Sequence, residues 1–285
     1  MPIRVAAIGV SHWHSLYDSA YLRHLAGLPD MRLVALQDSS AEIAAQRAAA
    51  LGDPAVYTDY RRMLMETRPD FVIALGRHSS MAETALDLLD QGYPFLIEKP
   101  MGVDADEVER VADRATAKNA FVAVPLGQRY HPFVARARTL SAEARFGPLS
   151  HIYFRLNRPT SARYVAWDAP WMLSLRDAGG GCLRNLGPHG LDLFLFLTGE
   201  DAHVTGAQIS SRALDHEVED YASVLLRSAG GVLGTIEVGN TFPRMGTDGE
   251  SKIAWRDAIL ILKDDILRLT TAAGEETASG APAEP

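Results

Sequence analysis

Five short apolar segments in the first 125 residues constrain the fold most. They cover residues 3–9, 32–37, 71–75, 95–97 and 121–124 and lack strict apolar–polar alternation, as is typical of strands buried on both faces. Helical patterns at 41–51, 81–91 and 104–118 separate them, the first two ending at Gly52 and Gly92. Repeated β-α-β units predict an α/β domain with a doubly wound parallel sheet over residues 1–124.

The pattern changes after Pro125. A helix is predicted over 131–144 and a buried helix over 188–197, and a long irregular stretch between them ends in three glycines at 179–181. The predicted strands are residues 149–156, 221–226, 232–238, 253–255 and 258–262. Strands in succession indicate a second, α+β domain over 125–285 with a largely antiparallel open sheet. The tail, 272–285, is small and polar, and we expect it to be mobile.

Charge and cysteine content exclude several classes of protein. The chain has 28 basic and 36 acidic residues, a net charge of -8, without a basic block, which argues against nucleic-acid binding. Cys182 is the lone cysteine, so a reducing compartment fits best. The opening segment is too short for a signal sequence, and no apolar run approaches the roughly 20 residues that span a bilayer. We therefore expect a cytoplasmic protein that does not bind membranes.

The first strand leads into a loop, residues 9–14, where a dinucleotide-binding fold places its phosphate loop. Gly9 matches the first glycine of that motif, Ser11 takes the second position, and His14 at the third is expected to push helix and strand apart. Cofactor binding and a plain βα turn both remain open. His12 and His14 provide only two ligands, fewer than the three or four of a zinc site, and we predict no metal.

Asp38 follows the second strand, 24 positions after His14, close to the roughly 20 residues at which an acidic group meets the ribose of NAD. A carboxylate there would repel a 2′-phosphate and favours NAD over NADP. The alternative is that Asp38 caps the next helix together with Ser39 and Ser40.

Two further clusters carry polar groups suited to chemistry. Glu98-Lys99-Pro100 follows the strand at 95–97, at the carboxyl edge where open α/β sheets bind ligands, although a solvated strand end would look the same. Asn185, His189 and Asp192 stand at i, i+4 and i+7 on one face of an otherwise apolar helix, and Pro188 falls in its first turn if the helix starts near Asn185. Converging polar groups favour a site, and a satisfied His–Asp core pair is the alternative.

From residue 3 to about 269 the sequence resembles the Gfo/Idh/MocA family of NAD(P)-dependent oxidoreductases. The motifs that carry the resemblance are Glu98-Lys99-Pro100, Gly180-Gly181 with Gly187-x-His189-x-x-Asp192, Tyr130-His131-Pro132 and the stretch Gly231–Gly239. The resemblance implies an N-terminal Rossmann domain and a C-terminal α/β domain whose open sheet often forms oligomers, so we expect a homodimer or homotetramer through that sheet.

The resemblance also implies residue roles. Lys99 would touch the substrate hydroxyl and the nicotinamide ribose, His189 would be the acid/base, and Asp192 would partner the substrate or the histidine. The implied cofactor-binding residues are Gly9, Val10, Ser11, His12, Trp13, His14, Asp38, Gly76, Arg77, His78, Glu98 and Lys99. The predicted substrate contacts are Lys99, His189, Asp192, Arg155, Arg158, Tyr164 and Trp167.

Several positions depart from the family pattern. Asn185 replaces an aspartate four residues before the histidine, and it cannot take a proton. Gly76-Arg77-His78-Ser79 replaces a Pro-Asn-His turn, the phosphate loop lacks two glycines, and the chain ends early, without a closing helical segment.

The leading hypothesis is an NAD(P)-dependent dehydrogenase or reductase, with Lys99, His189 and Asn185 as its catalytic residues. Its substrate would be a secondary hydroxyl or carbonyl of a sugar, polyol or cyclitol-like compound. The alternatives are an NAD-assisted glycosidase on the same scaffold and a non-catalytic cofactor or ligand sensor.

Overall fold

The computed structural model describes residues 1–17 and 19–281 and divides into two compact units. The first unit comprises residues 1–125 and 163–179, and the second comprises 126–162 and the chain from Gly180 onward. One domain was expected over residues 125–285, so the grouping of 163–179 with the first unit differs from that expectation.

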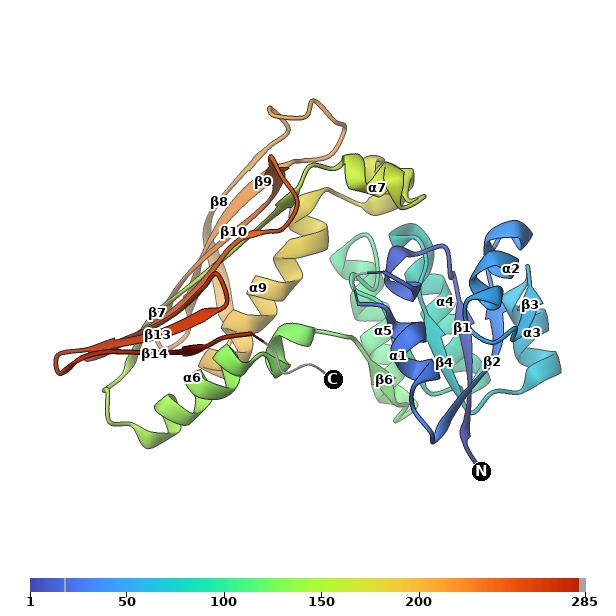
Figure 1. Cartoon of the computed structure of the whole chain (residues 1–285), viewed down its shortest axis with the longest axis horizontal. Coiled ribbons are helices and arrows are strands. Elements are labelled where there is room, and N and C mark those ends of the chain that lie inside the picture. The colour runs from blue at the N-terminus through green and yellow to red at the C-terminus, as the bar shows by residue number, and fades with distance from the viewer. Residues whose placement is uncertain (18, 282–285) are drawn as a thin grey trace. The chain divides into compact units, whose positions relative to one another are not determined.

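The first unit is built on a parallel six-stranded sheet in the order β3-β2-β1-β4-β5-β6, with helices on both faces (Figure 1), which confirms the predicted doubly wound architecture. The strands are β1 (Ile3–Ile8), β2 (Met31–Gln37), β3 (Ala55–Tyr57), β4 (Phe71–Ala74), β5 (Phe95–Ile97) and β6 (Val122–Ala123). The helices are η1 (Trp13–Ser15), α1 (Tyr21–Ala26), α2 (Ala41–Ala49), α3 (Tyr60–Thr67), α4 (His78–Gln91), α5 (Ala105–Ala117), α7 (Ala162–Ala166), η3 (Pro170–Leu173) and α8 (Leu175–Ala178). The sequence did not predict α1, β3, α3 or the short helices η1, α7, η3 and α8, the last three of which lie in the stretch expected to be irregular.

The central strand β1 explains why the apolar runs do not alternate. Ala6 and Ile8 belong to one apolar cluster, which includes Met81 of α4, while Val5 and Ala7 belong to another. Each face of the sheet therefore has its own core, and β1 must be apolar at every inward position. The strand order reverses beside β1, so the loops after β1 and β4 meet at the carboxyl edge where such sheets bind ligands.

The second unit is built on an eight-stranded sheet in the order β14-β13-β12-β11-β7-β10-β9-β8. Only the β10–β7 pair is parallel, which confirms the expected largely antiparallel sheet. The elements are η2 (Gly127–Tyr130), α6 (Pro132–Glu143), β7 (Leu149–Pro159), α9 (Cys182–Thr198), β8 (Ala202–Ser210), β9 (Tyr221–Ser228), β10 (Leu233–Phe242), β11 (Asp248–Trp255), β12 (Ala258–Lys263), β13 (Ile266–Thr271) and β14 (Gly274–Ser279).

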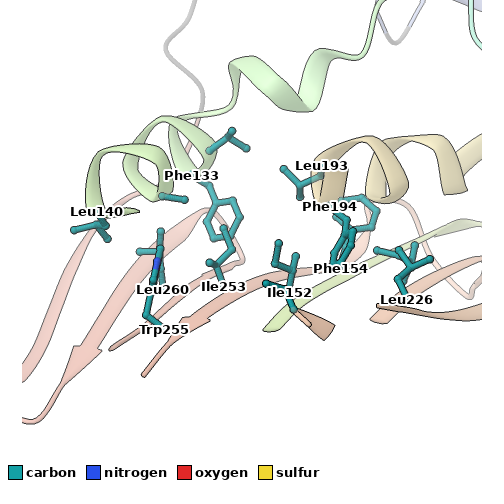
Figure 2. Close-up of a cluster of buried hydrophobic side chains, with 14 of the residues drawn as sticks. Phe133, Leu140, Ile152, Phe154, Leu193, Phe194, Leu226, Ile253, Trp255 and Leu260 are labelled. Carbon is teal, nitrogen blue, oxygen red and sulfur yellow. The ribbon is translucent and has the colours of Figure 1, made fainter. Parts of the chain in front are cut away.

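The core of this unit lies between the sheet and the helices α6 and α9. Figure 2 shows Phe133 of α6 and Phe194 of α9 over the strand residues Ile152, Phe154 and Ile253. A Cβ at Gly190 of α9 would lie 2.6 Å from the ring of Phe154, so only glycine permits this close packing of helix on sheet. The close packing fixes which face of α9 points away from the sheet.

Two expectations for this unit need correction. Helix α9 begins at Cys182, so Pro188 lies inside it and not in its first turn. Residues 274–279, expected to belong to a mobile tail, form β14 and pair with β13, while 282–285 lie outside the described residues. Within the described ranges, no helix is long and apolar enough to cross a membrane.

Candidate functional site

The loop after β1 turns sharply at Gly9. Its φ is +70°, and a Cβ there would lie 2.7 Å from the backbone oxygen of Leu75 in the loop after β4. Both facts require glycine, because an L side chain would be strained and would collide with backbone. Val10 is fully buried, and its carbonyl accepts a hydrogen bond of 2.8 Å from the Ser15 hydroxyl. This close approach of two βα loops is what a dinucleotide fold needs at its first glycine.

Asp38 ties the ends of β1 and β2 together. One carboxylate oxygen accepts the Ser11 backbone N–H at 2.7 Å, and the other accepts the Ser40 N–H at 3.1 Å. The N-cap of α2 is Ser40, whose hydroxyl accepts the Ile43 N–H. Ser40, and not Asp38, is thus the cap of α2, while Asp38 accepts N–H groups of the two loops and keeps acceptor positions for a ribose hydroxyl.

The three residues His12, Trp13 and His14 are buried and form the short helix η1 and its cap. A continuous helix does not follow the loop directly, since α1 starts only at Tyr21. The His12 ring stacks on Trp13 at 3.9 Å and its Nδ1 accepts the His14 backbone N–H. Burial first, and the neighbouring His14 second, hold the pKa of His12 well below its usual value, so its imidazole is neutral.

Residues 163–179 complete an aromatic cluster around Trp13. Trp167 stacks with Trp13 at 5.9 Å, and the Tyr164 ring lies 5.7 Å away. Tyr164 is fully buried and receives a hydrogen bond of 2.9 Å from Arg163. Two predicted substrate contacts, Tyr164 and Trp167, thus lie with the phosphate loop in the first unit.

His14 and Glu98 form a buried pair at the carboxyl edge. His14 Nδ1 lies 3.0 Å from Glu98 Oε2, and the other oxygen of Glu98 accepts the Lys99 backbone N–H at 3.1 Å. Burial alone would raise the pKa of Glu98, but the hydrogen bond and charge of His14, helped by the charge of Lys99, lower it to about 2. Glu98 is therefore ionised, and His14 Nδ1 carries the hydrogen.

Lys99 is only 5% exposed and directly follows β5 and Glu98. The peptide bond between Lys99 and Pro100 is cis. After β4, Gly76 has a φ of +123°, Arg77 is the exposed N-cap residue of α4, and His78 is buried with its Nδ1 2.9 Å from the Ala178 carbonyl oxygen. The first unit thus brings the predicted cofactor residues of four βα loops to one edge of its sheet.

In the second unit, α9 carries Asn185, His189 and Asp192. Asn185 is buried and His189 is half-buried. Arg129 of η2 holds the Asp192 carboxylate through both oxygens, and this hydrogen bond, more than the accompanying charge attraction, raises the pKa of Arg129. The partner of Asp192 in the structure is therefore an arginine.

Two groups that hold α9 could not be predicted from the sequence. The Glu219 carboxylate accepts the backbone N–H groups of Gly181 and Leu183, both at 2.8 Å, and so satisfies the start of α9. The second group is Arg129, which was not predicted although it directly precedes the Tyr130-His131-Pro132 motif. Nothing in the sequence pairs these residues with α9, because they lie 38 and 63 positions from their partners.

Arg155 and Arg158 each contact other side chains of the second unit. Arg155 binds Asp248 at 2.8 Å and Tyr153 at 3.1 Å, on the face of the sheet opposite the α9-covered residues Ile152 and Phe154. Arg158 donates to the Thr247 hydroxyl at 3.3 Å. The alternation of β7 places Arg155 away from α9, so its predicted substrate contact is not supported.

Across residues 1–17 and 19–281, no group of three or more His, Cys, Asp and Glu side chains is placed to hold a metal ion. Burial raises the pKa of the Cys182 thiol far above its usual range, which makes it a poor nucleophile.

Comparisons with known proteins match most of the chain to two domain families. The profile described as the oxidoreductase family, NAD-binding Rossmann fold, matches residues 3–126, and the GFO/IDH/MocA C-terminal domain matches 134–250. The trans-1,2-dihydrobenzene-1,2-diol dehydrogenase of Sus scrofa is 27% identical over 234 residues, covering 78% of this chain and 68% of the relative. The rhizopine catabolism protein MocA of Rhizobium meliloti is 26% identical over 225 residues, covering 77% and 68%.

Solved structures share the fold. The inositol dehydrogenase homologue of Azotobacter vinelandii, complexed with NAD+, superimposes with a TM-score of 0.84 at 21% identity, covering 98% of this chain and 76% of that one. A levoglucosan dehydrogenase complexed with NADH gives 0.83 at 22% identity, covering 100% and 82%. With both domain profiles matched along most of its length, the chain belongs to the Gfo/Idh/MocA family of oxidoreductases and carries that family's NAD-binding Rossmann domain.

Proposed function

We propose that the protein transfers hydride between NAD and a secondary hydroxyl or carbonyl of a sugar, polyol or cyclitol-like substrate. The observation that carries the proposal is a buried lysine, Lys99, beside the ionised Glu98 at the carboxyl edge of an NAD-binding sheet. The names of the relatives support the substrate class, since levoglucosan and inositol are polyhydroxylated rings and a dihydrodiol also carries secondary hydroxyls.

The residues present fit a dinucleotide. Gly9 provides a turn that any Cβ would fill, and Asp38 stands at the end of β2. The bound nicotinamide would supply the hydride acceptor or donor. The chain's own part is positioning and proton transfer: Lys99 would hold the reacting oxygen, and His189 would take up or return its proton.

Asn185 and Asp192 would act beside His189 on α9. Asn185, one helical turn before His189, can orient an imidazole or a hydroxyl but cannot balance a charge. Arg129 occupies two of the roughly four acceptor positions of the Asp192 carboxylate, so a substrate hydroxyl could bind the others.

The test starts with the cofactor. The purified protein is titrated with NADH, and nicotinamide fluorescence is followed; failure to bind at millimolar NADH would contradict the proposal. A panel of sugars and polyols is then screened with NAD by absorbance of the NADH formed. Binding without net NADH formation on any of them would favour the sensor or the glycosidase instead.

Preference for NAD over NADP is proposed from Asp38. Replacing Asp38→Asn keeps one oxygen for the Ser11 N–H but removes the charge that would repel a 2′-phosphate. We expect the ratio of NADPH to NADH affinity to rise about tenfold, or about 1.4 kcal/mol. Fluorescence titrations of both cofactors measure the ratio, and Asp53→Asn, an exposed position on the same unit, is the control. An unchanged ratio would remove Asp38 from cofactor selection.

We also propose a homo-oligomer through the open face of the eight-stranded sheet. That face carries exposed apolar residues such as Leu225, Leu233 and Ile259, next to the charged residues Arg155 and Glu237. Burying such a face in a symmetric contact would remove apolar area from water. Light scattering is expected to give a multiple of 31.0 kDa, and the mass of a single chain would contradict the proposal.

A further inference from the structure

Arg47 of α2 is a buried cation that the proposed reaction does not use. Its residue is only 4% exposed, between the buried helix positions Ala44 and Ala48. Its one hydrogen bond is long, 3.4 Å from Nη1 to the Tyr17 hydroxyl, and its guanidinium lies 5.2 Å from the centre of the Tyr17 ring. The buried Nε has no hydrogen-bond acceptor.

No carboxylate of the described residues forms an ion pair with Arg47. Among residues 1–17 and 19–281, none of the ion pairs involves Arg47, although most arginines of α3 and α5 are paired. A buried guanidinium without an anion is costly, because burial removes hydration that the Tyr17 hydroxyl and ring replace only in part. A binding partner that brings a negative charge would relieve this cost.

A cavity of about 320 Å³ lies against Arg47. It is lined by Tyr17, Gln46, Arg47, Ala166, Trp167 and Asp168. Arg47, the Tyr17 hydroxyl and the Gln46 amide offer hydrogen-bond donors, while the Tyr17 and Trp167 rings offer flat apolar walls. The volume lies at the lower end of small-molecule sites.

This cavity is separate from the predicted ribose contact. Arg47 lies seven residues beyond Ser40 along α2, which is about 10 Å along the helix axis from the carboxyl edge. Asp38, by contrast, lies at that edge. Arg47 therefore lies away from the predicted ribose contact, although Trp167, another lining residue, stacks on Trp13 of the loop after β1. A ligand of Arg47 would extend the protein's chemistry beyond hydride transfer.

We propose that the cavity binds a small organic carboxylate, with its anionic group on Arg47 and a flat or apolar body between Tyr17 and Trp167. A monoanion matches the single guanidinium that lines the cavity. The exposed Asp168 carboxylate also lines it and disfavours a dianion. Arg23, which lies 5.8 Å from the Tyr17 ring, is exposed and does not line the cavity.

The test uses the full chain in the absence of cofactor. Benzoate is the probe, and its binding is measured by calorimetry and ligand-detected NMR. We expect saturable binding with a Kd of about 1–10 mM and none for benzamide, the neutral isostere. Arg47→Met keeps the side-chain volume and should weaken benzoate binding by more than about tenfold, because it removes the charge. Arg110→Met, an exposed arginine of α5, should leave the binding unchanged.

A second variant does not depend on replacing a buried residue. Asp168 has a φ of +57°, which asparagine tolerates, so Asp168→Asn removes the repelling charge without new strain. Benzoate should then bind about threefold more tightly. Equal binding of benzamide, tighter binding of sulfate than benzoate, or unchanged affinity in both Arg47→Met and Asp168→Asn would overturn the proposal. Competition between benzoate and NADH would also overturn it as a separate site, whereas failure of NADH to bind would affect only the proposed reaction.

Discussion

Replacing Lys99→Met is expected to lower kcat by about a thousandfold while the NADH affinity stays within about tenfold. The side chain is almost fully buried, and methionine retains its unbranched apolar stem but not its ammonium group. If Lys99 holds the reacting oxygen, its loss removes an interaction needed by the chemical step and leaves the dinucleotide contacts of Gly9 and Asp38 in place.

Steady-state kinetics on a substrate found by the screen, together with NADH fluorescence titration, separate the two effects. Lys118→Met, whose amine pairs with Asp90 on the surface, is the matched control and should turn over normally. A Lys99→Met variant with near-normal kcat would exclude Lys99 from the chemistry. A variant that loses NADH binding as well would place the lysine in cofactor binding alone.

The sequence predicted the sheet of the first unit because the cores on both faces make its strands uniformly apolar. Val5 to Ile8 are all buried, so the run is apolar throughout and the strand is visible without any partner. The shorter β3, at the sheet edge with two exposed residues, gave no such signal. The sequence therefore reveals strands whose environment is apolar on both sides better than strands at an edge.

Contacts between residues far apart in the chain could not be predicted from the sequence. The i, i+4, i+7 spacing correctly placed Asn185, His189 and Asp192 on one helix, but helical periodicity says nothing about Arg129, which holds Asp192 from another element. The start of α9 was also misplaced: the helix begins at Cys182, where Glu219 accepts the N–H groups of Gly181 and Leu183, and Pro188 lies inside it. Such partners are set by tertiary packing.

His14 shows the same limit at the phosphate loop. By the glycine pattern it is an obstacle to close packing, and in the structure it instead bonds to Glu98, 84 residues away. The bond joins the loop after β1 to the end of β5, next to Lys99. The loss of glycine at this position is thus accompanied by a buried polar pair that the sequence motif does not contain.

The strength of that pair can be measured by replacing His14→Leu, which is expected to cost about 3 kcal/mol of unfolding free energy at pH 7. The variant leaves the Glu98 carboxylate buried with the Lys99 backbone N–H but without the His14 side-chain donor, and Lys99 and the neutral His12 are the remaining titratable neighbours. Adding Glu98→Gln removes the stranded charge, so the double variant should recover most of the loss.

The pH dependence of the unfolding free energy distinguishes the loss of a charged pair from the loss of a packing contact. In the native protein the pKa of Glu98, about 2, lies below its ordinary 4.5, so the pair stabilises the fold above pH 4.5 and this stability is lost as the pH falls toward 2. Without His14, burial raises the pKa of Glu98, and stability is then lost as the pH rises through the new value. The loss of unfolding free energy in His14→Leu, measured by urea unfolding, should therefore be smaller at pH 5 than at pH 7.

His12 loses a charged neighbour in this variant and shifts the pH dependence of the loss in the same direction. A double-mutant cycle with Glu98→Gln isolates the contribution of the His14–Glu98 pair. A deficit below 1 kcal/mol that does not change with pH would mean that His14 acts only as a space-filling ring.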